Sequence, residues 1–235
     1  MTHKRDFLHL FGVIPSPVEV FQDLRDDPRW KYPLLFFITT SALVGVCTVP
    51  ALLVPMRKVF ESSFGPGSAA AAIGAAKLYI GVNEVLVKPL KGLIGWIFLA
   101  SCLSIAATIS DSKREGVFRK TLSVIAYSET IFVFMRIVTL LIVYARGIES
   151  IESESDLIVF KGLEYLVHSR DIPPWANALI SSVHPFSIWY ILVVTVGVGI
   201  CCSLRRRTAL IVVVFSWALW SVADYLLGVA VAGVF

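Results

Sequence analysis

Long apolar runs separated by short polar turns dominate the chain. A helix needs about 20 mostly apolar residues to cross the hydrocarbon core of a bilayer, and five runs approach or reach that length. A β-barrel would show short segments of alternating polarity instead. The pattern predicts an all-α integral membrane protein, a bundle of five transmembrane helices with short amphipathic surface helices. We expect the spans at residues 34–54, 91–110, 121–145, 186–204 and 209–231.

The N-terminal segment carries charges throughout and has no apolar run of spanning length. Ser16 and Glu19 form a capping-box pattern that predicts a helix start, and Pro28 predicts the end of that helix. We assign residues 1–33 to a cytoplasmic amphipathic preface and residues 34–235 to a single membrane domain. Two interpretations of the preface stay open. It lies on an anionic lipid surface, or it packs against the bundle as a cap.

Residues 69–87 are rich in alanine but also contain Lys77, Asn83 and Glu84. These polar groups make the segment a poor membrane span, and a span here would reverse the sidedness of every later turn. We therefore expect a surface or partly embedded helix that continues, across a break at Pro89, into the next span. Whether this segment crosses the membrane stays open at this point.

The charge balance indicates orientation and excludes one class of partner. Mean hydropathy is +0.78, and only 16% of residues are charged. The net charge of +4 comes from basic residues that gather in turns beside the apolar runs, notably at 113–120 and 205–207. This distribution fits the positive-inside rule rather than a nucleic-acid surface. We expect a multi-pass protein of the cell membrane with a cytoplasmic N-terminus and a non-cytoplasmic C-terminus, and no nucleic-acid partner.

The residues that usually carry chemistry form no recognisable site. All four cysteines lie inside apolar runs, which favours a packing role over disulfides, and the histidines match no metal-ligand spacing. No serine lies in a GxSxG motif. We predict no catalytic residue, no metal and no cofactor. The expected partners are the lipid bilayer and other membrane proteins or further copies of the chain.

Three charged residues within the predicted spans are the candidate site: Glu129, Arg136 and Asp224. Glu129 and Arg136 are seven residues apart, which returns both to nearly the same helix face. Arg136 and Asp224 each lie fifteen residues beyond the start of their spans, at a depth of roughly 22 Å. Equal depth favours a buried Arg136–Asp224 ion pair that fixes helix packing. A proton or ion relay, or an Arg136 side chain that reaches outward to the interface, are the alternatives.

Three segments carry a resemblance to a known family. They read PSPVEVFQDLRDDPRWKYPLLF, then FRKTLSVIAYSETIFVF, and near the end HPFSIWYILVVTVGVG before a basic turn and a last span. In this order they resemble the Yip-type domain, named for Rab-GTPase-interacting membrane proteins, in the form found in prokaryotic chains. The resemblance covers nearly the whole length. The matched positions are Pro17, Phe21, Pro28, Trp30, Phe118, Ala126, Tyr127, Phe186, Trp189 and Gly197.

The resemblance implies a five-span domain with a cytoplasmic N-terminus. Eukaryotic members associate with Rab GTPases and with each other in vesicle traffic between the ER and the Golgi, whereas prokaryotic members as a family have no assigned reaction. This chain lacks the acidic DLYGP-type motif of the eukaryotic members, which argues against a Rab-like role. Glu129 stands where the family pattern has a small or apolar residue or proline, so we expect its arrangement with Arg136 to be specific to this branch.

Three functions follow from these observations. We favour a non-enzymatic membrane scaffold or interaction protein that binds membrane proteins or lipids. The alternative is a small transporter or channel subunit that uses Glu129, Arg136 and Asp224. An intramembrane enzyme is a third possibility, and it lacks a recognisable set of catalytic residues.

Overall fold

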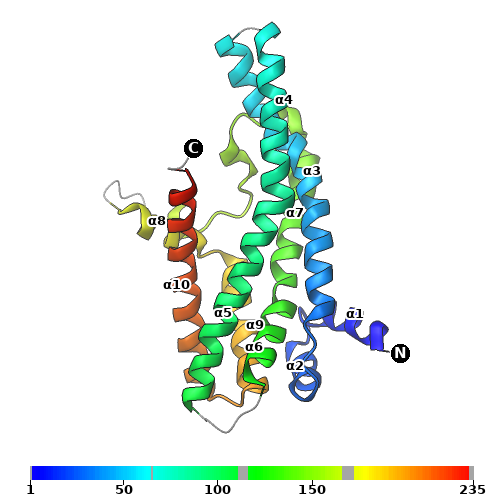
Figure 1. Ribbon diagram of the computed structural model, residues 1–235, viewed down its shortest axis with the longest axis vertical. Coiled ribbons are helices and arrows are strands. Elements are labelled where there is room, and N and C mark those ends of the chain that lie inside the picture. The colour runs from blue at the N-terminus through cyan, green and yellow to red at the C-terminus, as the bar shows by residue number, and fades with distance from the viewer. Residues whose placement is uncertain (1, 65, 111–115, 166–171, 233–235) are drawn as a thin grey trace. The chain divides into compact units, whose positions relative to one another are not determined.

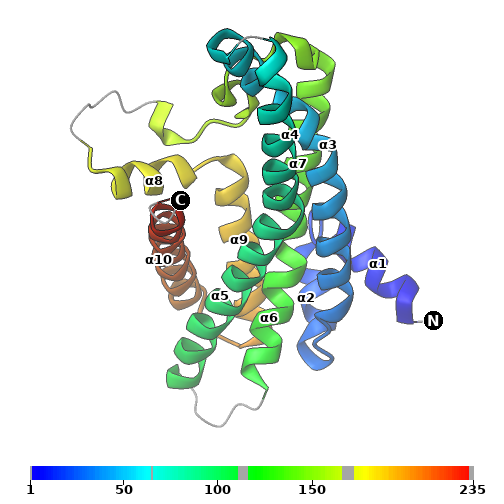
Figure 2. The same ribbon diagram turned by 45° about the horizontal axis from the view of Figure 1, so that its top comes forward.

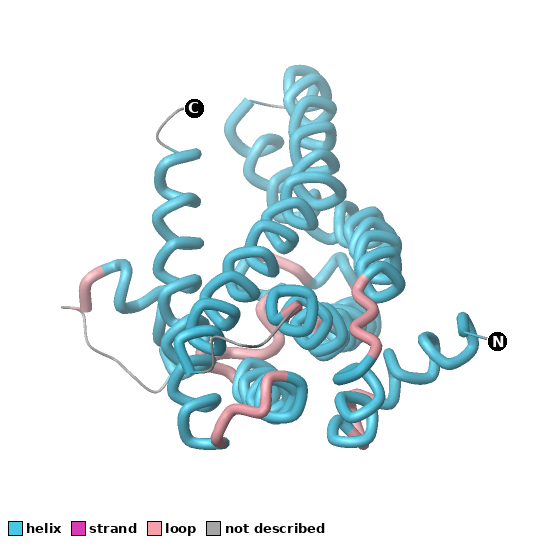
Figure 3. Tube along the Cα trace, turned by 60° about the horizontal axis from the view of Figure 1, so that its bottom comes forward, coloured by secondary structure: helices cyan, strands magenta, loops and turns pink. Residues whose placement is uncertain are grey.

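The computed structural model describes residues 2–64, 66–110, 116–165 and 172–232, and within them all regular structure is helical (Figure 3). Lys113 and Arg114 of the predicted basic turn lie outside the described residues. The α-helices are α1 (Thr2–Gly12), α2 (Pro17–Asp26), α3 (Lys31–Phe64), α4 (Pro66–Val82), α5 (Lys88–Ser110), α6 (Val117–Ser128), α7 (Thr130–Arg146), α8 (Pro174–Ser182), α9 (Pro185–Cys201) and α10 (Arg206–Ala232). Shorter helical turns are η1 (Asn83–Val87), η2 (Ile148–Ser150), η3 (Glu154–Leu157) and η4 (Leu163–Tyr165).

Four helical segments are long and apolar enough to cross a membrane: Lys31–Ser63, Ala70–Ser110, Val117–Arg146 and Arg206–Val229. α8 and α9 are bent by 72° at the residues between them, and they make a fifth span if the bent pair counts as one. The predicted all-α membrane fold is confirmed. The division into a preface at 1–33 and one membrane domain at 34–235 stays a prediction.

The first spanning helix is longer than the apolar run that predicted it. α3 continues through Pro50 and Pro55 as far as Phe64. A proline in a helix interior removes one backbone hydrogen bond, and membrane helices tolerate this where neighbouring groups compensate. Close to these prolines, the Tyr144 hydroxyl of α7 donates a hydrogen bond of 2.8 Å to the Cys47 carbonyl of α3.

α4, η1 and α5 follow one another without a turn, so the helix predicted at 69–87 does continue into the next span. The irregularity lies at η1, a π-helical turn in which the Lys88 N–H donates to the Asn83 carbonyl. Pro89 lies two residues after the end of η1 and has no N–H to continue the regular pattern. The structure therefore places the irregular turn before Pro89, whereas the sequence predicted a break at Pro89 itself.

The residues group into two compact units. The first unit comprises Met1–Leu35, Ile94–Phe132 and Lys161–Phe235, and the second comprises Phe36–Leu93 and Val133–Phe160. Three of the boundaries between them fall inside α3, α5 and α7, and the fourth falls between Phe160 and Lys161 in the loop before η4.

α9 is the central helix of the first unit, and it contacts α2, α6 and α10 (Figure 1, Figure 2). A Cβ atom on Gly197 would come within 2.5 Å of Val124 of α6 and 2.9 Å of the Phe21 ring of α2. The Cys201 thiol donates a hydrogen bond to the Phe21 carbonyl at 3.4 Å. Glycine at position 197 therefore allows three helices to meet closely.

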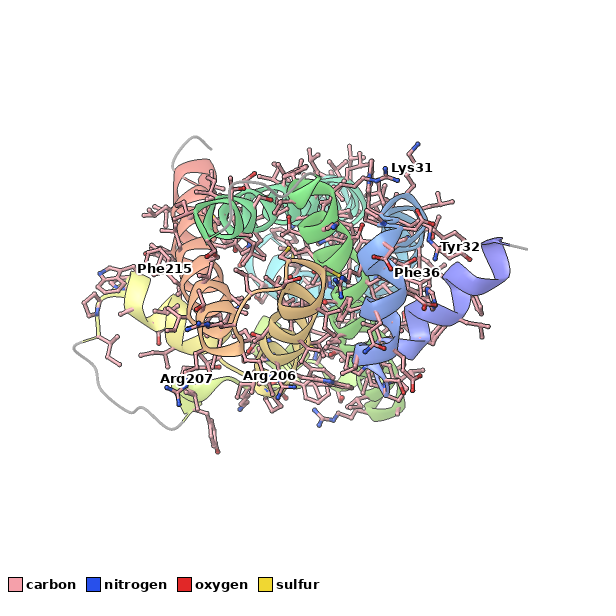
Figure 4. All side chains as sticks on the ribbon, turned by 90° about the horizontal axis from the view of Figure 1, so that it is seen from below. Lys31, Tyr32, Phe36, Arg206, Arg207 and Phe215 are labelled. Atoms are coloured by element: carbon pink, nitrogen blue, oxygen red, sulfur yellow. The ribbon has the colours of Figure 1, made fainter. Side chains whose placement is uncertain are left out.

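α10 packs mainly through one side. A Cβ atom on Gly95 of α5 would lie 2.8 Å from the Trp220 ring of α10, and the Trp220 ring is 5.5 Å from that of Phe98. Other large apolar side chains of α10, such as Phe215, remain exposed (Figure 4). In a bilayer this exposed apolar side is suited to contact with lipid chains.

The second unit has its own apolar cluster. Ala51 of α3, Val143 of α7 and Ile151 of the following loop are buried against each other. The Lys58 ammonium group donates hydrogen bonds to the backbone carbonyls of Glu149, at 3.4 Å, and Ile151, at 3.1 Å. These bonds fasten the loop to α3.

The preface helices belong to the first unit. Ser16 precedes α2 as its N-cap residue, as the sequence predicts, but its side chain makes no capping hydrogen bond. Leu10 of α1 and Phe21 of α2 are fully buried, whereas Phe7 and Phe11 of α1 are exposed. One face of the preface therefore packs against the protein, and apolar side chains remain on another face.

Candidate functional site: the intramembrane polar groups

Glu129 lies at the single-residue turn that separates α6 from α7. Its N–H donates to the Ile125 carbonyl at 3.0 Å, which continues the α-helical pattern, but its own carbonyl accepts from the Phe132 N–H at 3.0 Å. The second bond spans three residues rather than four, so the helix tightens locally at Glu129. The sequence predicts one uninterrupted span at 121–145, and the structure adds this turn within it.

Two buried hydroxyl groups accompany Glu129 in the first unit. Tyr190 of α9 is 2% exposed and Thr130 is 4% exposed, and neither hydroxyl has a hydrogen-bond partner among the described residues. The carboxylate of Glu129 interacts electrostatically with the Tyr190 phenol. Buried polar groups are ordinarily hydrogen-bonded, so these two hydroxyls form an unusual polar site inside an otherwise apolar helix bundle.

An aromatic cluster borders this polar site. The Phe132 ring lies 4.9 Å from the Tyr190 ring and 6.1 Å from the His184 ring, measured between centroids. His184 caps α9, because its Nδ1 atom accepts from the Ser187 N–H at 3.3 Å and its own N–H donates to the Ser187 hydroxyl at 2.8 Å. His184 therefore has a structural role at the start of this helix.

Arg136 of α7 contacts α3 within the second unit. Its Nη1 atom donates a hydrogen bond of 3.3 Å to the hydroxyl of Ser41. Its guanidinium carbon lies 5.9 Å from the centroid of the Phe37 ring, which is within the range of a cation–π contact. Both partners are buried, so Arg136 links α7 to α3 through a hydroxyl and an aromatic ring. Neither partner was found from the sequence.

Asp224 lies half-buried on α10 in the first unit. Arg136 belongs to the second unit, and the predicted Arg136–Asp224 ion pair therefore stays a prediction. The same holds for the predicted shared face of Glu129 and Arg136, because the unit boundary falls between them.

A close helix contact near Arg136 occurs at Gly45. The one-turn spacing of Ser41 and Gly45 predicts a helix-contact face, but the sequence did not predict η1 as its partner. A Cβ atom on Gly45, one turn after Ser41, would lie 2.8 Å from the Glu84 carbonyl oxygen, so the α3 and η1 backbones nearly touch. The Glu84 side chain is 9% exposed and accepts a hydrogen bond from the Lys88 ammonium group. The four-residue spacing of Glu84 and Lys88 was a usable signal, because it brings opposite charges together on one helix face.

An apolar groove of about 530 Å³ lies on the second unit. We call it the α4 groove. Leu78 in its wall is 70% exposed, and a Cβ atom on Gly74 or Gly81 would meet no atom within 4 Å. The groove is therefore bordered by glycines that no other part of the described chain covers. Its lining residues are Gly74, Lys77, Leu78, Gly81, Val82, Val85 and Leu86.

The described residues bring no three histidine, cysteine, aspartate or glutamate side chains together in a way that would hold a metal ion. All four cysteines are free thiols, with Cys201 and Cys202 buried and Cys47 and Cys102 partly buried. Cys47, Cys102 and Cys201 lie inside helices and Cys202 directly follows α9, positions that agree with a packing role.

The comparisons with known proteins identify the family. No curated protein and no solved structure matches the chain significantly. The family model of the Yip1 domain matches residues 11–223, which include the preface helix α2, the intramembrane residues Glu129 and Arg136, and most of α10. The chain therefore belongs to the Yip1 domain family and is a multi-pass membrane protein of that family.

Proposed function

We propose that this protein is a non-enzymatic membrane scaffold, which binds other membrane proteins or lipids. We also propose that it resides in the cell membrane with a cytoplasmic N-terminus and a non-cytoplasmic C-terminus. The basic residues Arg205, Arg206 and Arg207 before α10 support this orientation. A C-terminal reporter fusion that proves cytoplasmic would contradict it.

The α4 groove carries the scaffold proposal. Membrane helices associate by close packing at small residues, because lipid chains already satisfy large apolar side chains. Gly74 and Gly81 offer such a surface in the groove, and no described side chain fills it. A helix of a partner membrane protein could approach the α4 backbone here, and its polar atoms could accept a hydrogen bond from Lys77.

The intramembrane charges support a structural role in the same proposal. The Arg136 guanidinium contacts Ser41 and Phe37, which joins α7 to α3. The Glu84 carboxylate accepts a hydrogen bond from Lys88 one turn further along the same helical segment. An isolated charge in a membrane is costly, whereas a partnered one fixes the packing of its neighbours. We propose that Glu129, Arg136 and Asp224 maintain the bundle.

The test combines two substitutions in the groove. Gly74→Leu with Gly81→Leu would fill it with side chains, while Gly228→Leu fills open space on α10 and is the matched control, because a Cβ there also meets no atom within 4 Å. The tagged full chain is crosslinked in native membranes and purified. We expect the groove variant to lose its crosslinked partner with an unchanged melting temperature, and the control to keep it. Equal partner recovery from both variants would contradict the proposal.

A transporter or channel subunit is the second candidate function. The observation in its favour is the pair of buried hydroxyls on Thr130 and Tyr190, together with the electrostatic interaction between Tyr190 and Glu129. Proton flux into proteoliposomes, followed with a pH-sensitive dye, separates the two functions. A scaffold gives no flux above protein-free liposomes. A flux that Glu129→Gln abolishes in a folded protein would replace the scaffold proposal.

A further inference from the structure

A pocket of about 620 Å³ lies in the first unit where the preface meets α3 and α6. Three cationic residues line it: Arg29 in the loop before α3, Lys31 at the start of α3, and Arg119 on α6. The Arg119 Nε atom donates a hydrogen bond of 3.0 Å to the Pro28 carbonyl, which joins the two walls. The remaining lining residues are Pro28, Trp30, Tyr32 and Leu35. Figure 4 labels Lys31 and Tyr32 at this helix start.

The charges of the pocket favour an anion. One carboxylate, that of Asp27, lies 3.3 Å from the Arg29 Nε atom, and it is not part of the lining. The lining itself contains three cations and no acidic residue. A guanidinium has five N–H donors, and Arg119 uses one of them in the hydrogen bond to the Pro28 carbonyl. Arginine side chains bind phosphate oxygens with paired hydrogen bonds, and a lysine adds a point charge.

The pocket is charged at the ends of the spans and apolar further along them, toward the membrane interior. The candidate spans Lys31–Ser63 and Val117–Arg146 both begin beside it, so its cations lie at the end of two spans. Leu35 follows Lys31 by one helical turn and is 60% exposed. Trp30 and Tyr32 are residues typical of the membrane interface. A ligand here would meet cations at the interface and apolar side chains about 6 Å deeper.

We propose that this pocket binds the phosphate headgroup of an anionic phospholipid, with Arg29, Lys31 and Arg119 around the phosphate and Leu35 beside the start of an acyl chain. The proposal deepens the lipid-binding part of the proposed function, and it rests on that function only in placing the chain in a bilayer. The exposed Phe7 and Phe11 of the preface helix α1 are apolar side chains of the kind that enter a membrane interface.

The test titrates the full chain in neutral detergent with phosphatidylglycerol or with phosphatidylcholine, and counts bound lipids by native mass spectrometry. Each cation near a lipid phosphate contributes about a fivefold gain in affinity. We expect Lys31→Gln with Arg119→Gln to weaken phosphatidylglycerol binding about 25-fold and phosphatidylcholine binding much less, because the choline cation already offsets the charge of its phosphate. Soluble glycerol 3-phosphate should not compete at the lipid concentrations used, because it lacks the acyl chain that contacts Leu35.

The matched control is Arg206→Gln with Arg207→Gln at the start of α10, where both side chains are exposed and neither lines the pocket (Figure 4). It removes the same charge and should change binding less than twofold. Equal losses in both double variants would overturn the pocket and leave only general attraction of anionic lipid. Competition by glycerol 3-phosphate would assign the site to a soluble phosphate.

Arg119→Gln also removes the bond to Pro28, so Lys31→Gln alone decides the outcome if the double variant does not fold. Lys31 is exposed, and the single change should weaken phosphatidylglycerol binding about fivefold. An unchanged affinity in this variant would overturn the proposal. Partner crosslinking at the α4 groove should be unaffected, so the failure of one proposal leaves the other standing.

Discussion

Glycines occur in both α9 and α4, but their surroundings differ. In α9, a Cβ atom on Gly197 would be pressed against Val124 and Phe21, so that glycine is already used by the protein's own helices. In α4, Cβ atoms on Gly74 and Gly81 would meet nothing within 4 Å. Small residues in membrane helices serve close packing, and the α4 glycines have no packing partner within the described chain. Gly197 therefore serves a contact between the protein's own helices, whereas Gly74 and Gly81 leave a surface suited to a helix of another protein.

The largest expected difference comes from two phenylalanines. Phe21 is fully buried beside Gly197, whereas Phe215 on α10 is 68% exposed. Phe21→Ala should lower the free energy of unfolding by about 3–5 kcal/mol, because it leaves a cavity against α9. Phe215→Ala should change it by about 0.5 kcal/mol or less, because lipid or detergent replaces the lost contact. Chemical denaturation in detergent measures both. Similar losses would show that α10 is as closely packed as α9.

The next prediction concerns the α9 glycines themselves. Gly197→Ala should cost about 1–3 kcal/mol, because the new methyl group forces Val124 or Phe21 to move. Gly199→Ala is the control on the same helix, since its nearest contact for a Cβ atom is the Leu204 carbonyl at 3.7 Å. Alanine also suits a helix better than glycine, so the control should keep or slightly raise stability. Equal melting temperatures for the two variants would remove Gly197 as a close-packing position.

These contrasts mark how far the sequence predicted the structure. Apolar run length located the helices, and Pro17 located the start of α2, because these are local signals. The partners of Arg136 could not be predicted, since Ser41 is 95 residues away and only the folded chain brings them together. The same limit applies to glycine. Gly197 and Gly74 both lie in small, apolar surroundings in the sequence, and only tertiary structure shows which one is covered.

The smallest expected effect concerns the buried Tyr190 hydroxyl on α9. Tyr190→Phe removes a hydroxyl that has no hydrogen-bond partner among the described residues and keeps the ring against Phe132. The free energy of unfolding should stay the same or rise by about 1 kcal/mol, because an unsatisfied polar group no longer has to be buried. Thermal denaturation in detergent measures the change. A loss of about 1–3 kcal/mol would instead show that the hydroxyl is bonded, for example through water to Glu129.

The most direct test of the α4 groove uses two adjacent residues of nearly equal exposure. Leu78 lines the groove and is 70% exposed, whereas Tyr79 is 68% exposed and does not line it. A photo-activated crosslinking amino acid is placed at either position of the full chain in native membranes. The scaffold account predicts a discrete protein adduct from position 78 and no comparable adduct from position 79. Adducts of equal yield and mass pattern from both positions, or protein adducts from neither, would contradict it.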